Sequence, residues 1–113
     1  MKQKYNLLLH DILLSIERIQ EYIKECEYSD FKASQITIDA TIRNLEIIGE
    51  AVSQIPNEIK EKYTDIPWKE IKDFRNVVIH KYRTLDLEIL WDIIANRLDD
   101  LKIKIQSVKE YKK

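Results

Sequence analysis

The chain contains almost none of the residues that interrupt helices. Its 113 residues include one glycine and two prolines. Because these two residue types supply most tight turns and disfavour helix interiors, a chain nearly free of them has little material for a turn-rich β fold. A content of 44% hydrophobic and 35% charged residues is typical of a globular protein with a buried core. The sequence therefore predicts one all-α domain over residues 1–113.

Two long segments repeat their apolar residues at helical spacing. The first runs from about Gln3 to Tyr28 and the second from about Phe31 to Gln54, with a break at Ser29 and Asp30, either of which could cap the second helix. We expect the residues spaced three and four apart to be buried: Leu8, Ile12, Ile16, Ile19, Ile23, Cys26, Ile38, Ile42, Leu45, Ile47 or Ile48, Val52 and Ile55.

Gly49 lies inside the second predicted helix. A glycine there costs about 1 kcal/mol relative to alanine, so a close approach by another backbone should compensate. Either a crossing helix of the same chain or the backbone of a partner fits this expectation.

The second half of the chain predicts shorter helices. Pro56 ends the second long helix and can open a short one over 57–63, and Pro67 suits the first turn of a fourth helix that reaches Val78 or Ile79. After a break near 82–84, a fifth helix should begin near Leu85 and extend to Val108. The expected architecture is an antiparallel bundle of four to five helices, in which Trp68 and Trp91 belong to the core.

Composition also limits the partners and the compartment. The formal net charge of −1 argues against a general polyanion binder, and we expect neither DNA nor a membrane as a partner. Residues 68–83 nevertheless carry a local net charge of +3, and residues 102–113 carry +4. We see no secretion signal and no apolar run near the roughly 20 residues of a membrane span. With one cysteine, Cys26, the chain is expected to be cytoplasmic and to need no metal or cofactor.

One short run gathers polar side chains with chemical potential. Arg75, Asn76, His80, Lys81 and Tyr82 lie within eight residues, whereas the other histidine, His10, has no such companions and is expected to be an ordinary surface or half-buried residue. On a continuous helix, residues 75 and 80 are separated by about 140° around the axis. A helix break before His80, or two protomers that each contribute a set, could bring an arginine and a histidine to one reacting centre.

These residue types suffice for RNA cleavage. An imidazole with a pKa near neutrality can move the protons of the attacking 2′-hydroxyl or the leaving 5′-oxygen. The guanidinium of Arg75 can neutralise charge on the phosphoryl oxygens, and the amide of Asn76 can add an orienting hydrogen bond. Lys72, Lys81 and Arg83 are candidate contacts to RNA. The competing interpretation is an exposed helix end that carries ordinary polar residues.

The order and spacing of the residues in this run resemble a known motif. Arg75, four residues, His80, one residue and Tyr82 follow the Arg-x4-His-x-Tyr form found in the HepT-like toxins of the HEPN superfamily. Four further segments are similar to that family in the same order, so the resemblance covers about residues 5–105: they are 43–51 (RNLEIIGEA), 66–68 (IPW), 74–76 (FRN) and 85–91 (LDLEILW).

This resemblance implies an α-helical homodimer with the two motif copies facing a shared cleft. It implies a toxin that is a metal-independent endoribonuclease, with Arg75 and His80 as the catalytic pair and Asn76 in support. It also implies a partner, an MntA-like nucleotidyltransferase antitoxin that transfers AMP onto Tyr82. The alternatives are a non-catalytic binding partner or regulatory subunit of such a nucleotidyltransferase, and an unrelated structural bundle.

Overall fold

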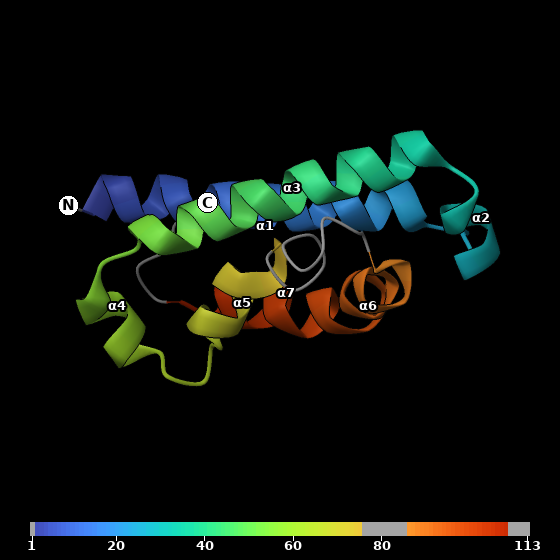
Figure 1. Ribbon diagram of the computed structural model, residues 1–113. Coiled ribbons are helices and arrows are strands. Elements are labelled where there is room, and N and C mark those ends of the chain that lie inside the picture. The colour runs from blue at the N-terminus through green and yellow to red at the C-terminus, as the bar shows by residue number, and fades with distance from the viewer. Residues whose placement is uncertain (1, 76–85, 109–113) are drawn as a thin grey trace.

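The computed structural model describes residues 2–75 and 86–108, and every regular element within these ranges is helical (Figure 1). Two long helices, α1 (Lys2–Ile23) and α3 (Gln35–Gln54), lie antiparallel and side by side in one layer. The second layer contains α5 (Trp68–Arg75) against α3, and a helical run against α1 that consists of α6 (Leu87–Asp92), the π-helix η3 (Ile93–Arg97) and α7 (Leu98–Gln106). The all-α bundle is confirmed.

The first long helix is shorter than expected. It ends at Ile23 rather than near Tyr28, because Glu25 adopts a left-handed backbone conformation with a φ of 63°. The chain then re-enters a helix at once, since Glu27 and Asp30 form a capping box that starts α2 (Tyr28–Lys32). The expected break at Ser29 and Asp30 is therefore wrong, because both residues lie inside α2.

The second long helix begins four residues later than expected. Ser34 caps α3, and its hydroxyl accepts a hydrogen bond from the backbone N–H of Thr37 at 3.3 Å. Phe31 belongs to α2 instead, where its fully buried ring lies 5.3 Å from the ring of Trp91. The short α2 therefore closes one end of the bundle.

The two prolines act as expected. Pro56 ends α3 and precedes α4 (Asn57–Lys62), and the carbonyl of Pro67 accepts the first intrahelical hydrogen bond of α5 from Ile71 at 3.0 Å. The described residues form more helical segments than the four or five expected, because α2 is separate and the last helix is divided by η3. The expected positions of Val78, of Ile79 and of the break near 82–84 lie outside the described residues.

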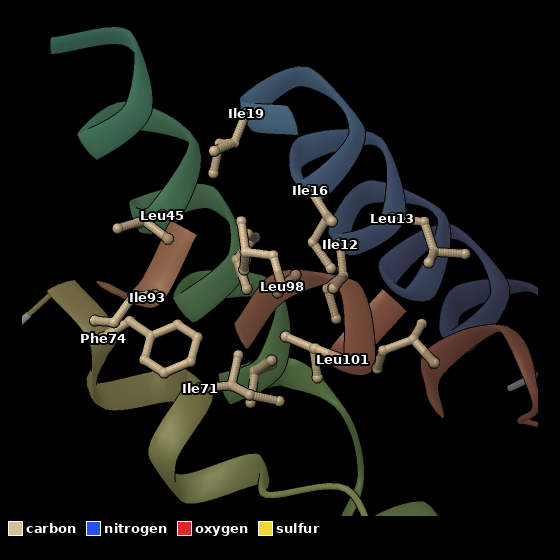
Figure 2. Packing of buried hydrophobic residues seen from close by; sticks show 14 of the residues in the cluster. Ile12, Leu13, Ile16, Ile19, Leu45, Ile71, Phe74, Ile93, Leu98 and Leu101 are labelled. Carbon is tan, nitrogen blue, oxygen red and sulfur yellow. The ribbon is translucent and has the colours of Figure 1, made fainter. Parts of the chain in front are cut away.

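One apolar cluster joins both layers. Figure 2 shows side chains of α1, such as Ile12 and Ile16, facing Leu98 and Leu101 from the last helical run, with Ile71 and Phe74 of α5 beside them. Most of the expected core positions are buried, and Ile23, Cys26 and Ile42 are half-buried against the cluster.

The two tryptophans pack as predicted. Trp68 is buried and its indole N–H donates to the carbonyl of Tyr63 at 3.1 Å, while Trp91 is half-buried beside Tyr28 and Phe31. His10 is exposed on α1, as expected. Among the described helices, none is both long enough and apolar enough to cross a membrane.

Candidate functional site

The structure places part of the predicted site. Lys72 lies exposed on α5, and Arg75 is the last residue of that helix. The other predicted site residues lie outside the described ranges: Asn76, His80, Lys81, Tyr82 and Arg83. The described elements nearest the run are α5, which precedes it, and α6, which follows it.

The position of α5 depends on its apolar side. Three side chains on that side are buried, with exposed fractions of 8% for Trp68, 0% for Ile71 and 4% for Phe74. A helix of eight residues is too short to be stable alone in water, so this burial holds it in place. Because Arg75 directly follows Phe74, the packing of Phe74 sets where the backbone of Arg75 lies.

A close backbone contact fixes α5 against α3. A Cβ atom added to Gly49 would lie 3.2 Å from the carbonyl oxygen of Lys72, which is tighter than ordinary van der Waals contact. The close approach predicted from the lone glycine is confirmed, and the approaching backbone is that of a crossing helix in the same chain. Gly49 therefore sets the distance between α3 and the helix that ends at Arg75.

An ion pair fixes the opposite side of α5. Arg97, the last residue of η3, pairs with Glu70, and its Nε atom lies 3.6 Å from a carboxylate oxygen of Asp92. A π-helix closes its hydrogen bonds one residue later than an α-helix, and such segments are frequent at functional sites. The π-helix was not predicted, because the residues of η3, Ile-Ile-Ala-Asn-Arg, are equally compatible with an ordinary α-helix.

The chain re-enters the described structure at a capped helix. The Asp86 carboxylate accepts a hydrogen bond from the backbone N–H of Ile89 at 3.1 Å, and Glu88 adds negative charge in the first turn of α6. The start expected near Leu85 is thus two residues early for the helix itself. The described elements on the two sides of the run are therefore α5, which is fixed on two sides, and this capped helix.

Two hollows flank α5. The first, of about 370 Å³, lies between α5 and the last helical run, and Glu70, Phe74, Arg97 and Lys104 are among its lining residues. The second is a shallow hollow of about 620 Å³ between α4 and α5. Within residues 2–75 and 86–108, no group of three or more His, Cys, Asp or Glu side chains could hold a metal ion.

Asn44 belongs to the α3 segment that resembles the family, and its role in the structure is to join helices. Its side-chain N–H groups donate to the carbonyl of Ala40 at 2.9 Å and to the hydroxyl of Tyr22 on α1 at 3.4 Å. The side chain is buried, and it therefore fixes the contact between α1 and α3.

Comparison with known proteins places these features in context. The sequence profile described as "Ribonuclease HepT-like" matches residues 12–108. A Thermococcus cleftensis protein named "Probable ribonuclease HepT" is 37% identical over 97% of this chain and all of its own length. A Methanocaldococcus jannaschii protein named "Putative RNase" is 37% identical over 95% of this chain and 98% of its own length.

A second protein of Methanocaldococcus jannaschii is longer. Its name is "Gamma-glutamylcyclotransferase and putative RNase", and it is 41% identical over 97% of this chain. The chain spans half the length of that relative. No solved structure matches the chain.

Proposed function

Since the chain belongs to the HepT-like ribonuclease family, we propose that it is a metal-independent endoribonuclease and the toxin of a toxin–antitoxin system. The observation that carries this proposal is the extent of the family match, which spans residues 12–108 and so includes the whole run from Arg75 to Tyr82. The names of two relatives that the chain covers almost completely, each called a ribonuclease or RNase, support the same activity.

The proposed reaction is attack by a 2′-hydroxyl on the adjacent phosphorus. His80 transfers a proton at the attacking or the leaving oxygen, Arg75 neutralises the phosphoryl oxygens, and Asn76 orients them. Lys72, Lys81 and Arg83 contact neighbouring phosphates. The described elements support this assignment, because α5 carries Arg75 and is fixed from both sides by Gly49 and Arg97.

We propose that the active species is a homodimer. Residues five apart do not share a face of a continuous helix, so a cleft between two copies would let Arg75 and His80 act on one phosphate. The lone thiol of Cys26 suits a reducing compartment, and the protein is proposed to act in the cytoplasm.

The proposed control of this activity is a modification of Tyr82. A nucleotidyltransferase antitoxin of the MntA type would transfer AMP onto its hydroxyl. AMP two residues from His80 would add negative charge and bulk where an RNA phosphate should bind.

The test is cleavage of RNA by the purified protein in EDTA. We expect Arg75→Ala and His80→Ala each to lower cleavage at least 100-fold, while circular dichroism shows an intact bundle. His10→Ala is the matched control, because His10 is the other histidine, is exposed and lies on α1. If folded protein free of AMP leaves RNA intact, the enzyme proposal is wrong, and a binding partner of the nucleotidyltransferase becomes the better interpretation.

The modification has its own test. Mass spectrometry after co-expression with the antitoxin should find AMP on Tyr82 and none on a Tyr82→Phe variant. AMP absent from Tyr82 would contradict this control without affecting the nuclease proposal.

A further inference from the structure

The hollow of about 370 Å³ between α5 and the last helical run takes part in none of the steps proposed above. Its volume lies in the range of pockets that bind small molecules, roughly 300–1,000 Å³. One wall includes three residues of α5, and the last of them, Phe74, directly precedes Arg75. Along α5, the five residues from Glu70 to Arg75 correspond to a rise of about 7.5 Å. The hollow therefore lies close enough to Arg75 to receive part of a nucleotide near the cleaved bond.

The charges in the lining of this hollow largely cancel one another. Its charged residues are Asp65, Glu70, Arg97, Asp100 and Lys104, so the formal sum is 2 − 3 = −1. Arg97 pairs with Glu70 from the opposite wall, and Lys104 pairs with Asp100 at 3.1 Å. A phosphate finds no excess cation here, and a basic side chain of a protein meets two cations. A neutral group is therefore the better occupant.

The base of a nucleotide is a neutral group with matching chemistry. The lining has an apolar part, which includes Ile71, Phe74 and Leu101 (Figure 2), and it has exposed polar side chains beside that part. A base likewise combines an apolar face with an edge of hydrogen-bond donors and acceptors, and single-stranded RNA leaves both available. A pocket of this kind can hold a base while the phosphates stay outside.

Asn96 of η3 can identify the base. Its Nδ2 atom donates a hydrogen bond to a carboxylate oxygen of Asp92 at 2.9 Å. Because an ionised carboxylate can only accept, this contact determines which end of the amide is the nitrogen. The amide keeps one N–H and its carbonyl oxygen for a ligand in the hollow. This donor and acceptor match adenine, whose N7 accepts a hydrogen bond and whose N6 amino group donates one.

Asp100 of α7 supplies a second acceptor. One of its carboxylate oxygens lies 3.1 Å from the Nζ atom of Lys104, and no described residue binds the other oxygen. A carboxylate accepts a hydrogen bond from the amino group of adenine or cytosine, whereas it repels the carbonyl oxygens of uracil. Asn96 and Asp100 therefore favour the same class of base.

We propose that this hollow binds one base of single-stranded RNA beside the cleaved bond, and that Asn96 and Asp100 select adenine over uracil. The proposal rests on the proposed ribonuclease function, and it adds a sequence preference to that function. Sequence analysis did not select either residue, because the hollow forms only where α5 packs against the last helical run.

The experiment measures binding separately from cleavage. In a His80→Ala background, fluorescence anisotropy gives the dissociation constants of labelled oligoadenylate, oligocytidylate and oligouridylate of equal length. We expect oligoadenylate to bind roughly 5-fold to 10-fold more tightly than oligouridylate, with oligocytidylate between them. Asn96→Ala and Asp100→Ala should each reduce the adenylate-to-uridylate ratio to about 2 or less. Neither should reduce the slope of log K against log salt, because no phosphate contact is lost.

Two matched controls come from the same helix. Asp99→Ala removes the neighbouring acid in the first turn of α7, and Gln106→Ala removes an exposed amide near its end; neither residue lines the hollow. Both variants should keep the wild-type ratio. Circular dichroism should show an intact bundle for all four variants, since all four side chains are exposed.

Two further measurements detect the contact directly. The ¹⁵N side-chain amide signal of Asn96, identified by its absence from Asn96→Ala, should shift with oligoadenylate and much less with oligouridylate. A merely structural role for Asn96 would not distinguish the two. In an RNA of mixed sequence, the wild-type protein should cleave mainly beside adenines, and Asn96→Ala should cleave with a weaker preference.

The outcomes separate this proposal from the nuclease proposal. A base preference that depends on both side chains, without cleavage by the wild-type protein, would support the base site and contradict the enzyme. Cleavage with a ratio that Asn96→Ala and Asp100→Ala leave unchanged would overturn the base site alone. The same unchanged ratio, together with a loss of dimer in these variants, would overturn it in favour of a protein contact. Absence of RNA binding by both the wild-type protein and the His80→Ala variant would overturn both proposals.

Discussion

The two layers of the bundle are held in place by different means. α1 and α3 are long helices with 22 and 20 residues, and burial of regularly spaced apolar side chains accounts for their contact. α5 has eight residues, and its place depends on three of its own buried side chains, on one glycine of α3 and on one ion pair with η3. The framework is therefore determined by a repeated pattern, whereas the helix that leads to the candidate site is determined by single contacts. Changes to the framework should affect stability, and changes around α5 should affect activity.

The largest expected effect comes from breaking the framework. Ile48 is fully buried on α3, and Ile48→Ala should lower the free energy of unfolding by about 2–5 kcal/mol through lost burial and a residual cavity. Urea denaturation measures this loss. RNA cleavage per folded molecule should stay near the wild-type value. A large loss of cleavage together with the loss of stability would show that the α1–α3 framework also controls the candidate site.

Changing Gly49 should instead affect cleavage more than stability. In Gly49→Ala the new methyl group meets the carbonyl of Lys72 and forces α5 away from α3. The higher helix propensity of alanine stabilises α3 by about 1 kcal/mol and so offsets the cost of this displacement. We expect cleavage to fall roughly 10-fold, because displaced catalytic groups lose rate steeply, with a stability change within about 1 kcal/mol of wild type.

Ser53→Ala, which alters an exposed residue one turn later on α3, is the control and should change neither cleavage nor stability. A Gly49→Ala variant with full activity would show that α5 tolerates displacement.

The Arg97–Glu70 pair should have a small effect on stability. Both side chains are about half exposed, so Arg97→Ala should cost no more than about 1 kcal/mol, and less in high salt. If the pair positions α5, Arg97→Ala should lower the turnover rate while RNA affinity changes little. The double variant Glu70→Arg with Arg97→Glu, which exchanges the two charges, should restore part of the turnover rate. Equal losses from Arg97→Ala and the exchanged pair would mean that Arg97 acts by another route.

The smallest effect concerns Cys26, at the end of α1 away from the site. Burial, and then the charge of Asp30, raise the pKa of its thiol above the ordinary value. The thiolate fraction at pH 8 is therefore low, and reaction with a disulfide reagent should be slower than for an unstructured cysteine peptide. The rate should rise with pH and reach its midpoint above the ordinary cysteine value. Asp30→Asn should lower that midpoint, and an unchanged midpoint would remove Asp30 as a cause.

The framework could be predicted from sequence because its causes repeat along the chain. Spacings of three and four identified most of the buried residues, and the two prolines marked the starts of α4 and α5. The lone glycine predicted a close helix crossing, because a glycine inside a helix needs a reason to be there. The left-handed Glu25 had no comparable signal, so the predicted end of α1 was wrong and the separate helix α2 was not predicted.

The candidate site was predicted only in part. The run from Arg75 to Tyr82 could be selected because its residue types match a reaction and a family motif. The Arg97–Glu70 pair could not be found in this way, since it joins residues from different helices whose contact depends on the tertiary fold. The spacing of these two residues in sequence has no period that a single chain could reveal.

Because of the π-helix η3, the position of Arg97 relative to α5 depends on the number of residues in the last helical run. It accommodates one residue more than an α-helical turn between the cap at Asp86 and the buried Leu98. Removal of that residue would leave a regular helix in which Arg97 is rotated by about 100° relative to the preceding turns. Deletion of the exposed Ala95 or Asn96 would therefore detach α5 from Arg97 while the buried Ile93 and Ile94 remain in the chain. Homologous chains that keep this pairing should be aligned here without gaps, and a gap would mark a relative that positions α5 differently.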